Sequence, residues 1–259
     1  MRRVVTCTRA GSIPYRAPTN CASCCPVMRA AAHTYTNFIP ACTVGLAFGR
    51  LFCSHEGVTT LLLIRHAHVH MPGPARLCGW FDPPLSRQGM EYLQRLHERG
   101  LATPRPEALY ASTLQRARDT AHAFADLWQL PVQEMDALRE IHCGELDGMP
   151  LGELEHRYPD LWQRNLAQCD DAFTWPGGES YRAFRRRIVD ALARIAAQHQ
   201  GQRVAIVTHA GVIAQVVNML EQRPAAVWEP HRPEPLSLTR VAWADGAPAA
   251  VLTFNERCW

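Results

Sequence analysis

Lysine is missing from this chain of 259 residues, in which all 27 basic residues are arginine. Without a lysine amine, the protein cannot form a Schiff base with a carbonyl substrate, and it cannot hold a nucleotide with the lysine of a P-loop. The formal net charge of +3 is also too small to indicate binding to nucleic acid. Two large enzyme classes are therefore excluded, and we expect no nucleic-acid partner.

Long apolar runs are also lacking. The most apolar stretch, from Phe38 to Phe48, is shorter than the ~18–20 residues that a membrane-spanning helix needs. It lies too far from the first residue for an ordinary signal peptide, and it shows no clear small-residue cleavage site. We therefore expect no membrane association and a cytoplasmic location. The four later cysteines should then be reduced thiols: Cys78, Cys143, Cys169 and Cys258.

Acidic residues are nearly missing from the first 57 positions, which hold six Arg but only Glu56 as an acid. Positions 58–259 hold 21 Arg and 23 acids, so charge divides the chain into two parts. No amphipathic period runs through the first part, and its Arg, Ser and Thr content leaves a transit peptide open. We interpret 1–57 as a poorly structured N-terminal extension, or as upstream sequence translated from an early start codon, and 58–259 as the domain.

Cysteine is concentrated in the same extension, which holds six of the ten. Cys21 and Cys24 have the spacing of a metal-ligand pair, and Cys42 and Cys53 are the candidates to complete a zinc site. The second pair lacks that close spacing, so zinc is the weaker interpretation.

Beyond position 58 the chain alternates between short apolar runs and helical patterns. Thr59 to Ile64 is apolar without alternation, as in a strand buried on both faces of a parallel sheet. Ser86 and Ser180 stand where side-chain caps begin helices. The predicted strands cover 59–64, 108–111, a stretch from Pro131, and 203–208; the predicted helices cover 86–99, 112–129, 180–199 and 212–220, and 236–254 is a predicted hairpin. This alternation predicts one α/β domain with a largely parallel sheet.

Two of the predicted strands end in histidine: Ile64-Arg65 leads into His66, and Thr208 leads into His209. Ligands of open α/β sheets bind in the crevice at the carboxyl ends of the strands. One histidine at a strand end is usually structural. Two at equivalent ends, with Arg65 beside them, combine a nucleophile with anion-binding groups. Without carboxylates to bind a metal, this group indicates a phosphoryl or other dianionic substrate.

Five motifs also follow one another in a recognisable order. They are Leu63-Ile64-Arg65-His66-Ala67; Ser112-x-Leu114-x-Arg116 with Thr120-Ala121; Leu138-Arg139-Glu140 with Gly144-x-Leu146-x-Gly148; Pro176-Gly177-Gly178-Glu179-Ser180; and Val207-Thr208-His209-Ala210-Gly211-Val212. The set, over about residues 59–220, resembles the histidine phosphatase superfamily, which includes the cofactor-dependent phosphoglycerate mutases. The resemblance implies a three-layer α/β/α fold with a mostly parallel central sheet. It also implies a covalent phosphohistidine on His66 and neither a metal nor another cofactor.

The residue types fit the chemistry that the resemblance implies. A neutral imidazole is a good nucleophile near pH 7, because its ordinary pKa is about 6.5. Phosphoryl transfer builds charge on the equatorial oxygens, and the implied phosphate pocket of Arg65, Arg116 and His209 offers fixed donors to them. Glu140 occupies the family's proton-donor position, where a carboxyl must stay protonated near neutrality. The predicted substrate-binding residues are the same three donors with Ala210, Cys78 and Gly79.

The first motif departs from the family's usual Arg-His-Gly, because Ala67 stands at the third position. Alanine should fit there unless the backbone needs a positive φ. The next four residues, His68-Val69-His70-Met71, lack the hydroxyl and amide side chains that many members have. The resemblance therefore does not say what this loop contributes to substrate binding.

Parts of the sequence are also compatible with two functions outside the phosphatase class. His66-x-His68 is the spacing of a metal pair in metal-dependent amidohydrolases, but the further Lys or Asp ligands at strand ends are missing. A binding module without activity would be expected to have lost a core residue, yet all five predicted catalytic residues are present. Both interpretations are weaker than a phosphatase.

Within the family the choice is between phosphatase and mutase. Gly79-Trp80-x-Asp82-x-x-Leu85-Ser86-x-x-Gly89 resembles the segment that meets the substrate carboxylate in mutases, although small phosphatases have similar sequence there. The chain lacks the lysine that mutases place after the glutamate motif, and its stretch between Glu140 and Pro176 is short beside the mutases' inserted cover, which excludes water. We predict a phosphomonoesterase for a small phosphorylated metabolite, with the mutase as the alternative and a homodimer left open.

Overall fold

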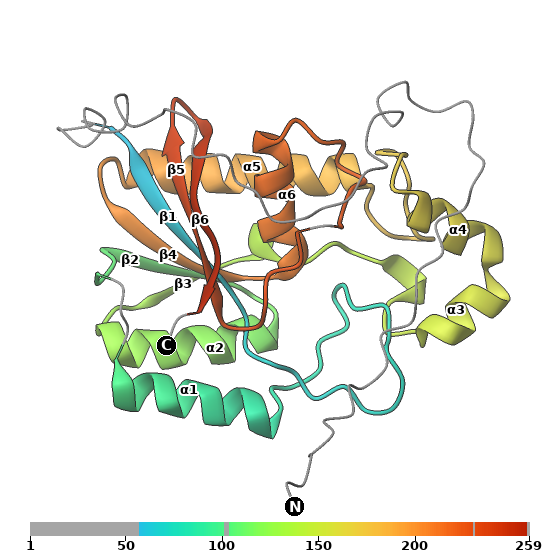
Figure 1. Ribbon diagram of the computed structural model, residues 1–259, viewed down its shortest axis with the longest axis horizontal. Coiled ribbons are helices and arrows are strands. Elements are labelled where there is room, and N and C mark those ends of the chain that lie inside the picture. The colour runs from blue at the N-terminus through green and yellow to red at the C-terminus, as the bar shows by residue number, and fades with distance from the viewer. Residues whose placement is uncertain (1–56, 101–103, 230, 258–259) are drawn as a thin grey trace, which may run out of the picture. The chain divides into compact units, whose positions relative to one another are not determined.

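The computed structural model describes residues 57–100, 104–229 and 231–257. The zinc and transit-peptide alternatives and the predicted extension fall on positions that lie, except for Gly57, outside the described residues. Within the described ranges, six strands form one sheet in the order β3-β2-β4-β1-β5-β6 (Figure 1). Their bounds are β1 Thr59–Arg65, β2 Ala108–Ser112, β3 Val132–Met135, β4 Arg203–Thr208, β5 Ser237–Ala244 and β6 Ala247–Arg257.

The first four strands of the chain run parallel to one another, and β5 and β6 form an antiparallel hairpin beside β1. Helices α1 (Arg87–Arg99) and α2 (Gln115–Trp128) cover one face of the sheet, and α5 (Tyr181–Gln198) and α6 (Ala210–Leu220) cover the other (Figure 1). The predicted three-layer α/β/α fold with a mostly parallel sheet is therefore confirmed. No helix in the described ranges combines the length and the apolar character needed to cross a membrane.

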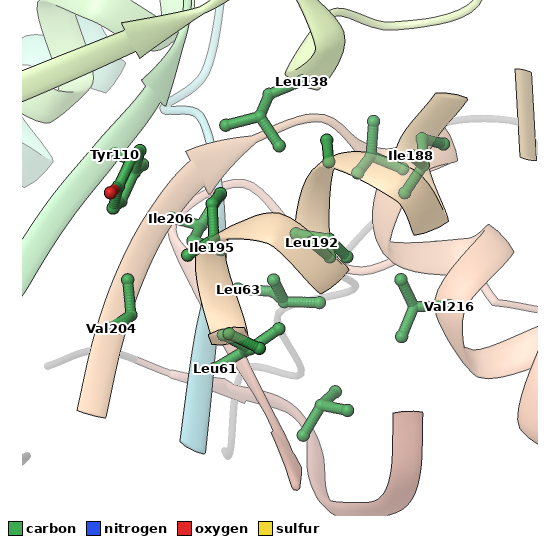
Figure 2. Packing of buried hydrophobic residues seen from close by; sticks show 14 of the residues in the cluster. Leu61, Leu63, Tyr110, Leu138, Ile188, Leu192, Ile195, Val204, Ile206 and Val216 are labelled. Carbon is green, nitrogen blue, oxygen red and sulfur yellow. The ribbon is translucent and has the colours of Figure 1, made fainter. Parts of the chain in front are cut away.

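Strand β1 lies between two apolar cores, which explains its unbroken apolar run. Leu61 and Leu63 pack in the core beneath α5 and α6, which Figure 2 shows from close by. Leu62 and Ile64 point to the opposite face and pack in the core beneath α1 and α2. Since successive side chains of a strand alternate between faces, only a continuous apolar run can fill both cores. Each fully buried side chain of this kind contributes roughly 1.5–3 kcal/mol.

The register between β1 and β4 aligns their carboxyl ends. Arg65 pairs with Thr208, so the next residue of each strand, His66 and His209, leaves the sheet at the same edge. The backbone N–H of His66 donates to the carbonyl of Thr208 at 2.9 Å and extends this pairing by one step. The predicted meeting of the two histidines is a direct result of the parallel register.

Three elements differ from the sequence prediction. The helix expected from Ser112 begins at Gln115, because Ser112 is the last residue of β2. Asp82, from a distant loop, caps this helix by accepting from the backbone N–H groups of Gln115 and Arg116. The chain also forms two short helices that were not predicted, α3 (Leu151–Arg157) and α4 (Pro159–Ala167). Residues of these helices pack on a third apolar cluster, centred on Phe173 and Trp175.

Candidate active site

His66 is buried at the end of β1, and its ring has one nitrogen engaged. Nδ1 lies 2.8 Å from the carbonyl oxygen of Ala67, so this nitrogen carries the proton and donates it. Burial lowers the pKa of the ring well below its ordinary range, and the positive charges of Arg116 and Arg65 add to this effect. The imidazole is therefore neutral near pH 7, with the Nε2 lone pair available to attack an electrophile.

The backbone after His66 accepts alanine without strain. Ala67 is fully buried, and it is not among the residues with a positive φ. Its N–H donates to the Thr120 hydroxyl at 3.0 Å, and that hydroxyl donates to the carbonyl of Arg116 at 2.7 Å. Because the backbone at Ala67 does not need a positive φ, alanine in place of the family's usual glycine does not strain it.

Three buried donor groups lie around His66 and lack a hydrogen-bond partner among the described residues. They are Nε of Arg65, Nε of Arg116 and Nδ1 of His209. The rings of His66 and His209 have centroids 5.2 Å apart, and the charges of both arginines act on both rings. Since buried polar atoms in proteins are nearly always paired, three unpaired ones in one place indicate a binding site for an acceptor such as a phosphoryl group.

The rest of each donor side chain is held by the protein. Arg116 donates through Nη1 to the carbonyl of Phe81 at 2.8 Å and through Nη2 to that of Gly79 at 2.7 Å, and it pairs with Asp82 at 3.0 Å. Arg65 donates to the carbonyl of Pro233 at 2.6 Å. Nε2 of His209 lies 2.7 Å from the hydroxyl of Ser112, at the end of the neighbouring strand β2. The donors are thus fixed before any substrate binds.

Burial lowers the pKa of His209 well below its ordinary range, and the charges of Arg116 and Arg65 add to this. Burial likewise lowers the pKa of Arg65, while the charge of Glu140 opposes that shift. The positive charges of the two arginines therefore lie in a poorly solvated space. A dianionic ligand would relieve that charge.

Glu140 lies against this group, with its carboxyl buried. Burial raises the pKa of Glu140, while hydrogen bonds from the N–H groups of Gly211 (2.9 Å) and Ile141 (3.0 Å) oppose the shift. The positive charges of Arg116 and Arg65 act in the same opposing direction. A carboxyl with a raised pKa next to a nucleophile is suited to donate a proton to a leaving group.

The segment that carries Glu140 is irregular, and a second salt bridge holds it. Arg187 of α5 pairs with Glu179 and donates through Nη2 to the carbonyl of Glu140 at 3.2 Å. Its Nη1 donates to the carbonyls of two further residues of the segment, Ala137 and Arg139, at 2.9 and 3.0 Å. Glu179 accepts from the N–H of His142 at 2.9 Å. We call Arg187 and Glu179 the brace, since together they bind four backbone groups of one loop.

Trp80 fixes the same loop from the other side. Its Nε1 donates to the carbonyl of Glu140 at 2.9 Å, and its ring contacts the guanidinium of Arg139 and the ring of His142. Neither the brace nor Trp80 was assigned a role from the sequence. Glu179 and Trp80 do lie in quoted motifs, and that was the available signal, whereas Arg187 lies in no such motif.

For the remaining predicted substrate-binding residues, the structure shows only contacts within the protein or their place in the chain. The N–H of Gly79 donates to Asp147 at 2.8 Å, and the thiol of Cys78 lies 3.5 Å from the carbonyl of Phe81. Burial raises the pKa of that thiol. Ala210 is the first residue of α6, directly after His209. Substrate contacts from Cys78, Gly79 and Ala210 remain predictions.

A pocket of about 320 Å³ opens beside His66, lined among others by Arg65, by the loop from His68 to Met71 and by Ser86. The ring of His68 is exposed and bonds through Nδ1 to the Ser86 hydroxyl at 2.8 Å. In the described part of the chain, no three His, Cys, Asp or Glu side chains gather in a way that would hold a metal ion.

Known proteins are similar to this chain in sequence. The model of the histidine phosphatase superfamily (branch 1) matches residues 61–256. A metal-independent phosphoserine phosphatase of Arabidopsis thaliana is 33% identical over 170 residues, which cover 65% of this chain and 71% of that protein. An adenosylcobalamin/alpha-ribazole phosphatase of Escherichia coli is 30% identical over 180 residues, which cover 65% of this chain and 82% of that protein.

Solved structures agree with these sequence matches. The structure of Bacillus stearothermophilus YhfR superimposes with a TM-score of 0.69 at 28% identity, covering 76% of this chain and 97% of that one. Mycobacterial glucosyl-3-phosphoglycerate phosphatase has a TM-score of 0.67 at 24% identity, covers 77% of this chain and 99% of that one, and supports the fold alone. The resemblance found in the sequence is confirmed. The chain belongs to the histidine phosphatase superfamily, branch 1.

Proposed function

We propose that the protein hydrolyses a small phosphomonoester by way of a phosphoryl group carried on Nε2 of His66. The protein is a phosphoric monoester hydrolase of its superfamily, as the sequence predicted; the proposal concerns the atoms that carry the reaction and the substrate. The observation that supports it best is the neutral ring of His66 facing three buried donors without partners.

In the first step, Nε2 of His66 would form a bond to phosphorus while the bond to the leaving oxygen breaks. Arg65, Arg116 and His209 would stabilise the charge on the three equatorial oxygens. The proton of Glu140 would pass to the leaving oxygen. In the second step, water would attack phosphorus, Glu140 would take up a proton from it, and release of phosphate would restore the free ring.

The substrate would be a small phosphorylated metabolite. The related proteins named above are a phosphatase of phosphoserine and one of adenosylcobalamin/alpha-ribazole, which both fit this class. A 30% identical protein of Arabidopsis thaliana is described as phosphoglycerate mutase-like, so the mutase stays the alternative. Against it stand the missing lysine and the short segment between Glu140 and Pro176, which folds into α3 and α4. A cytoplasmic location and a homodimer stay predictions.

The test is phosphate release by the purified full chain from a panel of alkyl and aryl phosphomonoesters. Rapid quenching with radiolabelled substrate should trap a phosphoryl group that is stable in base, labile in acid and located on His66. EDTA should leave the rate unchanged, because the proposed donors are Arg and His side chains. Label on a serine or aspartate, or loss of activity that zinc or manganese restores, would overturn the mechanism. Transfer to a second phosphoglycerate in place of water would favour the mutase.

A further inference from the structure

The pocket beside His66 extends from Arg65 along the loop that departs from the family pattern. Its lining includes His68, Val69, His70 and Met71, together with Ser86 and Pro235. About 320 Å³ is at the small end of the range for ligand sites, which suits a leaving group of a few atoms beside one phosphoryl group.

The loop presents three histidines to this space. Val69 bridges to Leu85, and the backbone bonds between His70 and Pro84 (2.8 Å) and between Ser86 and His68 (2.9 Å) hold the segment extended. In an extended segment every second side chain lies on the same face, so His68 and His70 point to the same side of this loop. All three line the pocket.

The charge of the lining is one-sided. No aspartate or glutamate lines the pocket, while both His68 and His70 are exposed within it. Beyond the lining, the charges of Glu140 and Glu234 act on Arg65 in one direction and the charge of Arg232 acts in the other. A leaving group with an ammonium group would find no acceptor of opposite charge here. A leaving group with a carboxylate would find two imidazoles as donors.

One of the two imidazoles is already oriented. The hydrogen bond between Nδ1 of His68 and the Ser86 hydroxyl fixes the ring, and Ser86 is itself fixed because it caps α1 by accepting from Gly89 at 3.0 Å. Nε2 of His68 is then left for a ligand. A ring held in place loses less freedom on binding than a mobile one.

We propose that His68 and His70 bind a second acidic group on the leaving group, so that the preferred substrate is a small phosphomonoester that also carries a carboxylate. This inference rests on the proposed function, and it deepens it by naming the substrate class. It adds the prediction that the enzyme discriminates between leaving groups of equal size by their charge.

The test compares three phosphomonoesters of equal length: 2-phosphoglycolate, 2-hydroxyethyl phosphate and O-phosphoethanolamine, whose ends are negative, neutral and positive. The kcat/KM of the full chain should be about fivefold to tenfold higher for phosphoglycolate than for the hydroxyethyl ester, as expected for one or two partly exposed hydrogen bonds to a carboxylate. It should be lowest for phosphoethanolamine.

The variant His68→Leu with His70→Leu keeps similar size but offers no hydrogen-bond donor to a carboxylate. Its ratio of kcat/KM between phosphoglycolate and the hydroxyethyl ester should fall to within about twofold of one. His97→Leu, at an exposed histidine in the last turn of α1, is the matched control and should keep the wild-type ratio.

The outcomes separate this inference from the function beneath it. If the wild type hydrolyses 4-nitrophenyl phosphate but shows no preference for phosphoglycolate, the inference fails and the phosphatase function stands. A ratio that survives in the double variant also overturns it, because the preference then comes from other residues. If no phosphomonoester is hydrolysed, including the aryl ester, the proposed function fails and this inference with it.

Discussion

The two halves of the candidate site are built by different means. In the strand-end half, His66 and His209 follow the central strands β1 and β4, and the sheet register alone places them together. In the loop half, Glu140 lies on an irregular segment, and side chains from α5 and from other loops hold its backbone. Backbone pairing is insensitive to single side chains, whereas side-chain bracing is not. The loop half should therefore respond to substitutions that never touch a substrate.

The largest effect should come from removing the nucleophile of the strand-end half. His66→Ala should abolish turnover of every phosphomonoester, alkyl or aryl, because no other group can accept the phosphoryl group. Steady-state phosphate release measures this, with thermal melting to verify the fold. Full activity in His66→Ala would show that the strand-end half does not carry the reaction.

The next effect should come from the loop half and depend on the leaving group. Glu140→Gln should slow alkyl phosphates by ~10²–10⁴-fold, as is typical when a general acid is lost. An activated aryl phosphate leaves as an anion, so it should slow much less, with a residual deficit from the water step. Because burial raises the pKa of Glu140, the wild-type rate with alkyl phosphates should fall as rising pH removes its proton, and Glu140→Gln should lack this fall.

Single-turnover measurements separate the two steps of that prediction. If phosphorylation of the enzyme by an alkyl phosphate is unchanged in Glu140→Gln, the acid lies elsewhere. Glu145 and Asp82 would then be the next candidates from the sequence, although Asp82 already caps α2 and pairs with Arg116.

A smaller effect should follow from weakening the brace. Arg187→Ala removes donors to three carbonyls of the Glu140 loop, so the carboxyl should lose its position. We expect kcat with alkyl phosphates to fall about tenfold, within the cost of a small misplacement of a catalytic group. The aryl phosphate should be affected less, which would show that Arg187 acts through Glu140. Arg186→Ala, an exposed neighbour on α5, is the control. Equal losses for both substrates would instead indicate a general structural role.

The smallest effect should come from removing residues 1–57, which contribute no predicted residue to either half of the site. A chain that begins at Val58 should keep its kcat and its melting temperature, because the composition of residues 1–57 offers little to pack against a domain. Circular dichroism melting and phosphate release measure this. A large drop in melting temperature would show that the extension is part of the folded unit.

What the sequence predicted well was local. The unbroken apolar run of β1, the caps Ser86 and Ser180, and the histidines at two strand ends are all signals contained within a few positions. The structure confirms these elements. Each segment packs against the sheet, or lies within it, by the apolar pattern of its own residues. The motifs added Glu140, which no local pattern would have distinguished from an exposed loop acid.

What the sequence did not predict depends on contacts between distant positions. Trp80 and Glu140 are 60 positions apart, and Arg187 lies 47 positions from the carbonyl that it binds. Helix α2 likewise begins where Asp82 caps it from 33 positions away, not at the serine that its own sequence offers. The short helices α3 and α4 have no side-chain caps of their own. One chain without tertiary information carries no signal for these pairings.

Two glycines, Gly79 and Gly211, lie so close to the loop half that a mutational scan could mistake them for catalytic residues. A β-carbon on Gly79 would lie 2.2 Å from the carbonyl oxygen of Ile141, and one on Gly211 would lie 2.2 Å from Oε1 of Glu140. Alanine at Gly79 must therefore displace the backbone of the acid loop, and alanine at Gly211 must displace the Glu140 carboxyl, although neither glycine has a side chain that could do chemistry. A scan scored by activity would rank these positions beside the nucleophile. Loss of activity at these positions would report a steric clash with the loop. Only the structure distinguishes such a clash from the loss of a reactive group.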